Sequence, residues 1–193
     1  MSPPLYRRLL GAAFDTLPAR VRELHDLAGV SVWQGRAKVE RGRFVVARIA
    51  ATLSSLPPEG DDQPLRVTFA AVGDKEIWAR QFGKALFRSV QYERNGQLRE
   101  RVAITTFVFT AVASADGLAL RLDGFRLLGL PMPRLVHPAV RTFESERDGR
   151  YHFEAEAHLP RVGLLVRYTG WLEQMPLGAK QRARDPRMLG DAS

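Results

Sequence analysis

The sequence predicts an α+β fold: N-terminal helices and a strongly curved antiparallel β-sheet or barrel of about eight strands. The first observation behind this prediction is a period-two alternation of apolar and polar residues, which dominates residues 65–172. The second is a series of two-residue turn signals, of which Asn95-Gly96 and Asp148-Gly149 are typical of type I′ hairpins. A sheet of this length must curl or close to protect its edges.

The first 60 residues mix helical and strand patterns. Residues 3–28 predict two short helices, because Pro18 suits the first turn of a second helix and Gly29 suits its end. Residues 30–40 alternate as a strand. Residues 43–56 carry an apolar stripe at helical spacing, which predicts a helix inserted after the first strand.

The remaining elements are strands joined by turns. The predicted strands are 65–70, 77–82, 86–94, 99–113, 118–125, 150–159 and 163–172. Between the fifth and the sixth of these lies an apolar segment, Gly124–Pro133, punctuated by two glycines and two prolines. Proline removes a backbone donor, so we expect an excursion that closes one end of the concave side of the sheet, followed by a loop through Phe143.

Two architectures fit these elements. In a helix-grip fold, a curved sheet wraps a helix around an internal cavity, and the helix predicted after the first strand favours it. In a lipocalin-like fold, the sheet closes as a barrel, and the absence of a long C-terminal helix favours that alternative.

The composition of the chain limits which classes of protein it can belong to. We expect one domain over residues 1–173 and a disordered basic tail over residues 174–193. The chain has no Cys, which excludes disulfides and thiolate chemistry. Its net charge is +8, but the basic residues are scattered, so we expect no nucleic-acid partner. No apolar run is long enough for a membrane span and no secretory signal is visible, so we expect a cytoplasmic protein.

No catalytic or metal-binding motif is apparent, so the sequence assigns no catalytic residue, metal site or cofactor. The densest titratable cluster is His152, Glu154, Glu156 and His158, on one face of a predicted strand. It spans too great a length for one metal ion, and we interpret it as a solvent face whose glutamates pair with arginines on adjacent strands. We interpret His25 as a packing residue and His137 as a loop residue.

Pairs of aromatic and cationic residues are the best candidates for a binding site. Trp78 and Arg80 share one strand face, and Arg167 and Trp171 share another. If these faces point inward, an arginine beside a tryptophan suits an anionic group on an otherwise apolar ligand. The alternative is that each Trp is core and each Arg reaches solvent. The candidate ligand-binding residues are Trp78, Arg80, Phe107, Arg126, Met132, Arg167 and Trp171.

Several short segments of the sequence, taken together, form a pattern specific enough to indicate a protein family. They are Leu5–Gly11 with Phe14, Leu24-His25, Gly35–Val39, Trp78–Gly83, Phe125–Pro133, Gly149–Phe153 and Gly163–Leu172. Across residues 4–173, the chain resembles a bacterial domain family of unknown function, DUF4166. Members of that family occur alone or fused to saccharopine-dehydrogenase-like or epimerase-like NAD(P) domains. The resemblance implies an NAD(P)-dependent oxidoreductase as a partner and carries over no catalytic residue.

The sequence therefore favours a non-enzymatic domain that binds an apolar or amphipathic small molecule in the cavity of a curved sheet. The first alternative is an accessory module that docks on an NAD(P)-dependent oxidoreductase. The second is a hydrolase or isomerase that uses polar groups in the cavity.

Overall fold

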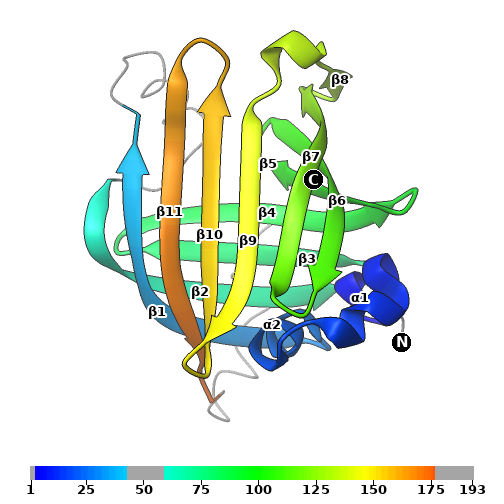
Figure 1. Cartoon of the computed structure of the whole chain (residues 1–193), viewed down its shortest axis with the longest axis vertical. Coiled ribbons are helices and arrows are strands. Elements are labelled where there is room, and N and C mark those ends of the chain that lie inside the picture. The colour runs from blue at the N-terminus through cyan, green and yellow to red at the C-terminus, as the bar shows by residue number, and fades with distance from the viewer. Residues whose placement is uncertain (1–2, 43–58, 177–193) are drawn as a thin grey trace.

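The computed structural model describes residues 3–42 and 59–176. Within them, helices α1 (Leu5–Leu10), η1 (Gly11–Thr16) and α2 (Ala19–His25) precede a β-barrel (Figure 1). The ten barrel strands of the described residues are β1 (Val30–Arg41), β2 (Gly60–Val72), β3 (Lys75–Phe82), β4 (Ala85–Arg94), β5 (Gln97–Val102), β6 (Thr105–Ser114), β7 (Gly117–Leu127), β9 (Ala139–Arg147), β10 (Arg150–Leu159) and β11 (Gly163–Gln174). The short β8 (Leu130–Pro131) and η2 (Arg134–Val136) lie between β7 and β9.

The sheet closes into a barrel because each of its ten strands pairs with a neighbouring strand on both sides. Consecutive strands pair antiparallel from β1 to β7, β7 pairs with β9, and β9 to β11 continue the order. β11 then pairs with β1, from Trp33 opposite Gln174 to Arg41 opposite Val166. The predicted antiparallel sheet is confirmed and is a closed barrel; the helix-grip arrangement is not confirmed. The helix predicted over 43–56 lies outside the described residues.

The barrel has more strands than the predicted eight for two reasons. The predicted strand 99–113 belongs to two strands, β5 and β6, joined by a turn at Ala103 and Ile104, where Ala103 has a φ of 49°. Alanine is uncommon at positive φ, so no turn signal marks this position. The segment predicted as a loop up to Phe143 contains the first half of β9.

The apolar segment Gly124–Pro133 begins as a strand rather than as an excursion. β7 continues through it to Leu127, paired with β6. The register shifts by one residue beside Gly124, as it does at a β-bulge. Leu128 and Gly129 then form a two-residue turn with φ of 50° and 80°, and β8 folds back onto β7.

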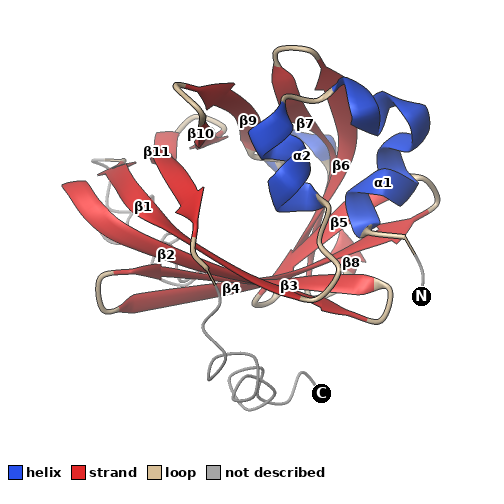
Figure 2. Ribbon diagram, turned by 90° about the horizontal axis from the view of Figure 1, so that it is seen from below, coloured by secondary structure: helices blue, strands red, loops and turns tan. Residues whose placement is uncertain are grey.

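The N-terminal helices lie at one end of the barrel (Figures 1 and 2). Their apolar residues, Leu5, Phe14, Val21 and Leu24, are fully or almost fully buried and belong to the same hydrophobic core as the inward side chains of the strands. The helices end earlier than Gly29, at His25. The carboxylate of Glu146 on β9 accepts a hydrogen bond of 2.9 Å from the backbone N–H of Arg20, which satisfies a free donor in the first turn of α2.

Candidate functional site

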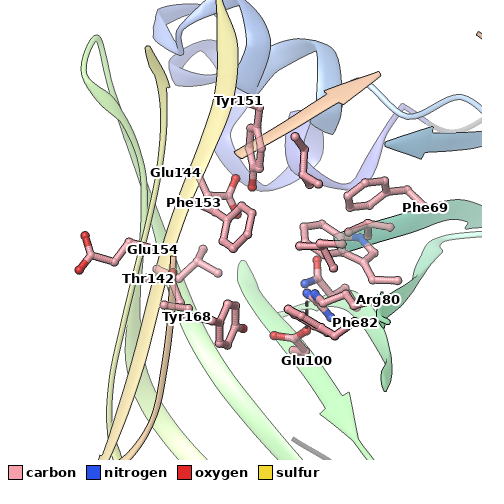
Figure 3. Close-up of a pocket in the computed structure, with 17 residues that line it drawn as sticks. Phe69, Arg80, Phe82, Glu100, Thr142, Glu144, Tyr151, Phe153, Glu154 and Tyr168 are labelled. Atoms are coloured by element: carbon pink, nitrogen blue, oxygen red, sulfur yellow. Dashed lines mark hydrogen bonds and ion pairs between the residues drawn. The ribbon is translucent and has the colours of Figure 1, made fainter. Parts of the chain in front are cut away.

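Two adjoining cavities lie inside the barrel among the residues that the structure describes. The first has a volume of about 70 Å³ and lies among the inward side chains of β2 to β5 and of β7 and β9 to β11 (Figure 3). The second has a volume of about 110 Å³ and a more apolar lining, which includes Phe87, Phe107 and Phe109. Both cavities touch Glu100, Thr142, Ala155 and Tyr168, so these four residues mark where the cavities meet.

Arg80 is the cation of the first cavity, and its charge is already paired. Its guanidinium donates to Ser89 Oγ at 2.9 Å and to Glu100 Oε1 at 3.3 Å. The guanidinium also lies over the rings of Trp78 and Phe87, at 4.8 and 5.3 Å from the ring centroids. Cation–π contacts of this kind stabilise a desolvated arginine. Across the cavity, Arg80 faces Phe153 and Tyr168 (Figure 3).

A second polar cluster lies toward the helical end of the same cavity. Glu144 on β9 accepts a hydrogen bond of 2.5 Å from Nε2 of His25, the last residue of α2. Tyr151 on β10 is also hydrogen-bonded to Glu144, and burial beside this carboxylate raises the pKa of the Tyr151 phenol well above its usual range. The phenol therefore stays protonated and can donate.

The three N-terminal helices α1, η1 and α2, which we call the helical plug, contribute a further polar contact. The Tyr6 hydroxyl of α1 donates to Gln91 Oε1 on β4 at 2.9 Å, and the Tyr6 ring lies 3.8 Å from the imidazole of His25, measured between centroids. Burial raises the pKa of Tyr6 well above its usual range. The helical end of the first cavity therefore holds several buried polar side chains, which include those of Tyr6, His25, Gln91, Glu144 and Tyr151.

Thr142 stands at the boundary of three spaces. Its hydroxyl is buried and has no hydrogen-bond partner among the described residues. It contacts both interior cavities, and also an open groove of about 610 Å³ between β7 and β9. These two strands pair only from Leu118–Arg121 to Arg141–Glu144, and beyond that stretch they diverge (Figure 1). The groove is therefore a place where the barrel wall opens beside the cavities.

The structure places the candidate ligand-binding residues in two groups. Trp78, Arg80 and Phe107 line the interior cavities, so it brings these three together. Arg126, Met132, Arg167 and Trp171 line neither cavity. Arg167 pairs with Glu156 at 2.7 Å on the outer face, and the ring of Trp171 lies under the guanidinium of Arg150.

The titratable face of β10 behaves as a solvent face. Glu154 points away from the cavity (Figure 3), and Glu156 accepts hydrogen bonds from Arg167 of the adjacent strand. The interpretation of this face as paired with arginines on neighbouring strands is confirmed at Glu156. The described residues contain no group of three or more His, Cys, Asp or Glu side chains placed to hold a metal ion.

Several polar residues of the interior were not among the candidates: Ser89, Gln91, Glu100, Thr142, Glu144 and Tyr151. The sequence indicates an interior position most clearly for Glu100, because it lies on the same strand face as Leu98 and Val102, both of which are buried. A carboxylate on an apolar strand face indicates a partner inside the fold.

No helix among the described residues has the length and the apolar character that crossing a bilayer requires.

Comparison with known proteins places the chain in a family. A search of the curated proteins finds no match. The model of DUF4166, a domain of unknown function, matches residues 17–172, which include β1 to β10 and nearly all of β11. The match covers most of the chain, and the chain therefore belongs to the DUF4166 family.

Proposed function

We propose that the barrel binds a small amphipathic molecule in its two interior cavities. The observation that carries the proposal is a difference between the two linings: the first cavity combines paired and hydrogen-bonded polar groups with apolar side chains, and the second is lined mostly by apolar side chains. An apolar cavity of about 150 Å³ is enough for a benzene-sized ligand. The volumes of about 70 and 110 Å³ therefore suit a compact ligand rather than a long lipid.

The polar end of the ligand would meet the junction of the cavities. There the unpartnered hydroxyl of Thr142 supplies a hydrogen bond that no described residue uses. The phenol of Tyr168 lies at the same junction, and its pKa is raised by burial, so it stays neutral. The groove between β7 and β9 offers the nearest way in from solvent.

The charged side chains that line the first cavity favour a ligand whose polar end is neutral or cationic. Glu100 and Glu144 supply two carboxylates against one permanent cation, Arg80, which is already bonded to Glu100. A carboxylate ligand would meet like charge in a site of low dielectric. Six aromatic rings line the same cavity and attract cations; they are Phe69, Trp78, Phe82, Tyr151, Phe153 and Tyr168.

A homologous series of ligands tests this proposal. Native mass spectrometry and calorimetry would compare n-alkylamines, n-alkanols and n-alkanoates of about four to about ten carbons. We expect affinity to rise about fourfold per methylene until the apolar cavity is full. Amines and alcohols should bind more tightly than the carboxylates.

Two variants separate binding inside the barrel from binding on its surface. Ala155 touches both cavities, so Ala155→Leu should fill their junction and abolish binding. Ala79 lies between Trp78 and Arg80 on β3 and therefore faces outward, so Ala79→Leu is the matched control. Failure of every chain length to bind, or unchanged binding by Ala155→Leu, would reject the proposal.

A second candidate function is acid–base chemistry on the bound molecule. It is favoured by Glu144, a carboxylate of the cavity wall that is oriented by His25 and Tyr151. A carboxylate oriented in this way can remove a proton next to a carbonyl group. Proton NMR of short aliphatic ketones in deuterium oxide would detect such exchange. Exchange no faster than in buffer, or unchanged exchange in Glu144→Gln, would reject this candidate. The association with an NAD(P)-dependent oxidoreductase stays a prediction.

A further inference from the structure

The end of the barrel opposite the helices carries an exposed apolar surface (Figure 1). Leu128, Leu130 and Leu135 are 71%, 69% and 68% exposed, which makes them the most exposed large apolar side chains of the described residues. Val136 and Ile104 are 44% and 54% exposed. We call these five residues the apolar rim. Isolated exposed leucines are normal, but a group of them within one segment indicates an interaction surface.

The rim is held in place by backbone hydrogen bonds rather than left as a loose loop. The N–H of Leu128 donates to the carbonyl oxygen of Ile104 at 2.8 Å, which joins the turn after β7 to the turn after β5. Met132 N–H donates to Phe125 O at 3.0 Å, and the imidazole of His137 lies 2.8 Å from Met132 O. The leucines are therefore presented to solvent by a fixed backbone.

The chain segment that carries four of the five rim residues has charges of one sign only. Between Asp123 and Glu144 the chain contains no acidic residue, but it contains Arg126, Arg134 and Arg141. The whole chain has a net charge of +8. Apolar side chains flanked by arginines fit the interface of a bilayer that contains anionic lipid. In a symmetric dimer the same surface would meet itself, and these arginines would repel one another.

We propose that the apolar rim docks the barrel on an anionic lipid surface. The leucines at the Leu128–Leu130 turn enter the interfacial region, and Arg126 and Arg134 lie at the level of the phosphate groups. The groove between β7 and β9, which includes His137 and Val140, lies beside the rim. Docking therefore brings this opening of the barrel wall close to the lipid.

Co-sedimentation with vesicles tests the proposal. Vesicles of phosphatidylcholine alone would be compared with vesicles that contain phosphatidylcholine and phosphatidylglycerol in about a two-to-one ratio. We expect binding to the mixed vesicles and weak binding to the neutral ones. Removing one arginine by Arg134→Gln should weaken the binding about fivefold.

The variant Leu128→Asn/Leu130→Asn removes apolar surface while keeping the turn, because asparagine tolerates the positive φ of position 128. It should weaken vesicle binding by at least about tenfold. Leu86→Asn is the matched control, since Leu86 is 49% exposed on β4 outside the rim. Thermal melting checks that the variants remain folded; if the double variant does not fold, Leu135→Asn replaces it.

Three results would overturn the proposal. One is the absence of binding to either kind of vesicle. Another is equal binding by the double variant and the wild type, which would assign the affinity to dispersed positive charge. The third is a rim-dependent dimer in sedimentation velocity, or rim-dependent capture of an acidic protein without vesicle binding. Because Ala155→Leu leaves the rim untouched, it should still bind vesicles, which separates this proposal from ligand binding inside the barrel.

Discussion

Nε2 of His25 lies 2.5 Å from a carboxylate oxygen of Glu144, 119 residues further along the chain. The imidazole is fully buried, and Tyr6 packs on its ring. The contact fixes the end of α2 to the inner wall of the barrel at β9. The helical plug is therefore attached by a specific polar contact as well as by apolar packing.

Loss of the Glu144 carboxylate should loosen this attachment. Glu144→Ala leaves the buried donors of His25 and Tyr151 without an acceptor, and removing one partner of a buried pair costs about 3 kcal/mol. Urea denaturation measures the free energy of unfolding. Glu154→Ala, on the outward face of β10, is the control and should change it by less than about 0.5 kcal/mol. Equal changes in the free energy of unfolding for the two substitutions would contradict the role of Glu144 in attaching α2 to β9.

Glu76→Gln should stabilise the fold at neutral pH. Burial raises the pKa of Glu76, against the opposing effects of His25 and of hydrogen bonds from Trp78 and the Leu5 backbone. A carboxyl group with a raised folded-state pKa contributes stability fully below its unfolded pKa of 4.5, and loses it as pH rises through the folded value.

The glutamine variant has no such titration, so its free energy of unfolding should fall less between pH 4.5 and neutrality. Since one oxygen of Glu76 has no hydrogen-bond partner among the described residues, we expect a gain of about 1 kcal/mol at neutral pH. Urea denaturation across this range would measure it, with Glu154→Gln as the control. If the free energy of unfolding depended more steeply on pH in Glu76→Gln than in the wild type, the predicted direction of the Glu76 pKa shift would be wrong.

Thr142→Val should raise stability while weakening ligand binding. The threonine hydroxyl is buried without a partner among the described residues, and valine has nearly the same shape, so the gain is about 1 kcal/mol. Thr110→Val offers a contrast on β6, because the Thr110 hydroxyl donates to Asp123 and its loss should destabilise. Thermal unfolding with and without an alkanol measures both effects. A destabilised Thr142→Val would mean that this hydroxyl is satisfied in solution.

Gly35→Ala should disrupt the closure of the barrel. Gly35 pairs with Leu172, and a methyl group there would overlap the backbone carbonyl of Trp171. Backbone cannot move aside as a flexible side chain can, so we expect a cost above about 2 kcal/mol. Gly29→Ala is the control, since no atom of the described part of the chain lies within 4 Å of its added methyl group. Denaturant unfolding that finds the two variants equally stable would contradict this account.

The parts of the fold that the sequence predicted well are those with strong local signals. Asn95-Gly96 and Asp148-Gly149 form the expected turns, with positive φ at both positions of each. β9 was missed because its inward side chains include Thr142 and Glu144, while Phe143 lies on the opposite face. Polar residues at a cavity reverse the usual pattern of a half-buried strand, so alternation alone misleads there.

The candidate site could be predicted only in part for a related reason. A period of two shows that Trp78 and Arg80 share a face and that Arg167 and Trp171 share another, but it does not show which face is inward. The first pair lines the cavity and the second lies outside. The contact of His25 with Glu144 joins a helix to a distant strand, and no local pattern encodes such a pairing.

The short strand β8 has a consequence for how this chain meets other chains through its backbone. It covers the β7 edge at Arg126 and Leu127, where the barrel wall opens. Its own outer edge is only two residues long and ends at Pro131, which has no N–H to donate. An incoming strand therefore finds no ladder to extend, and this end of the barrel is protected against fibril-like stacking although its side chains are apolar.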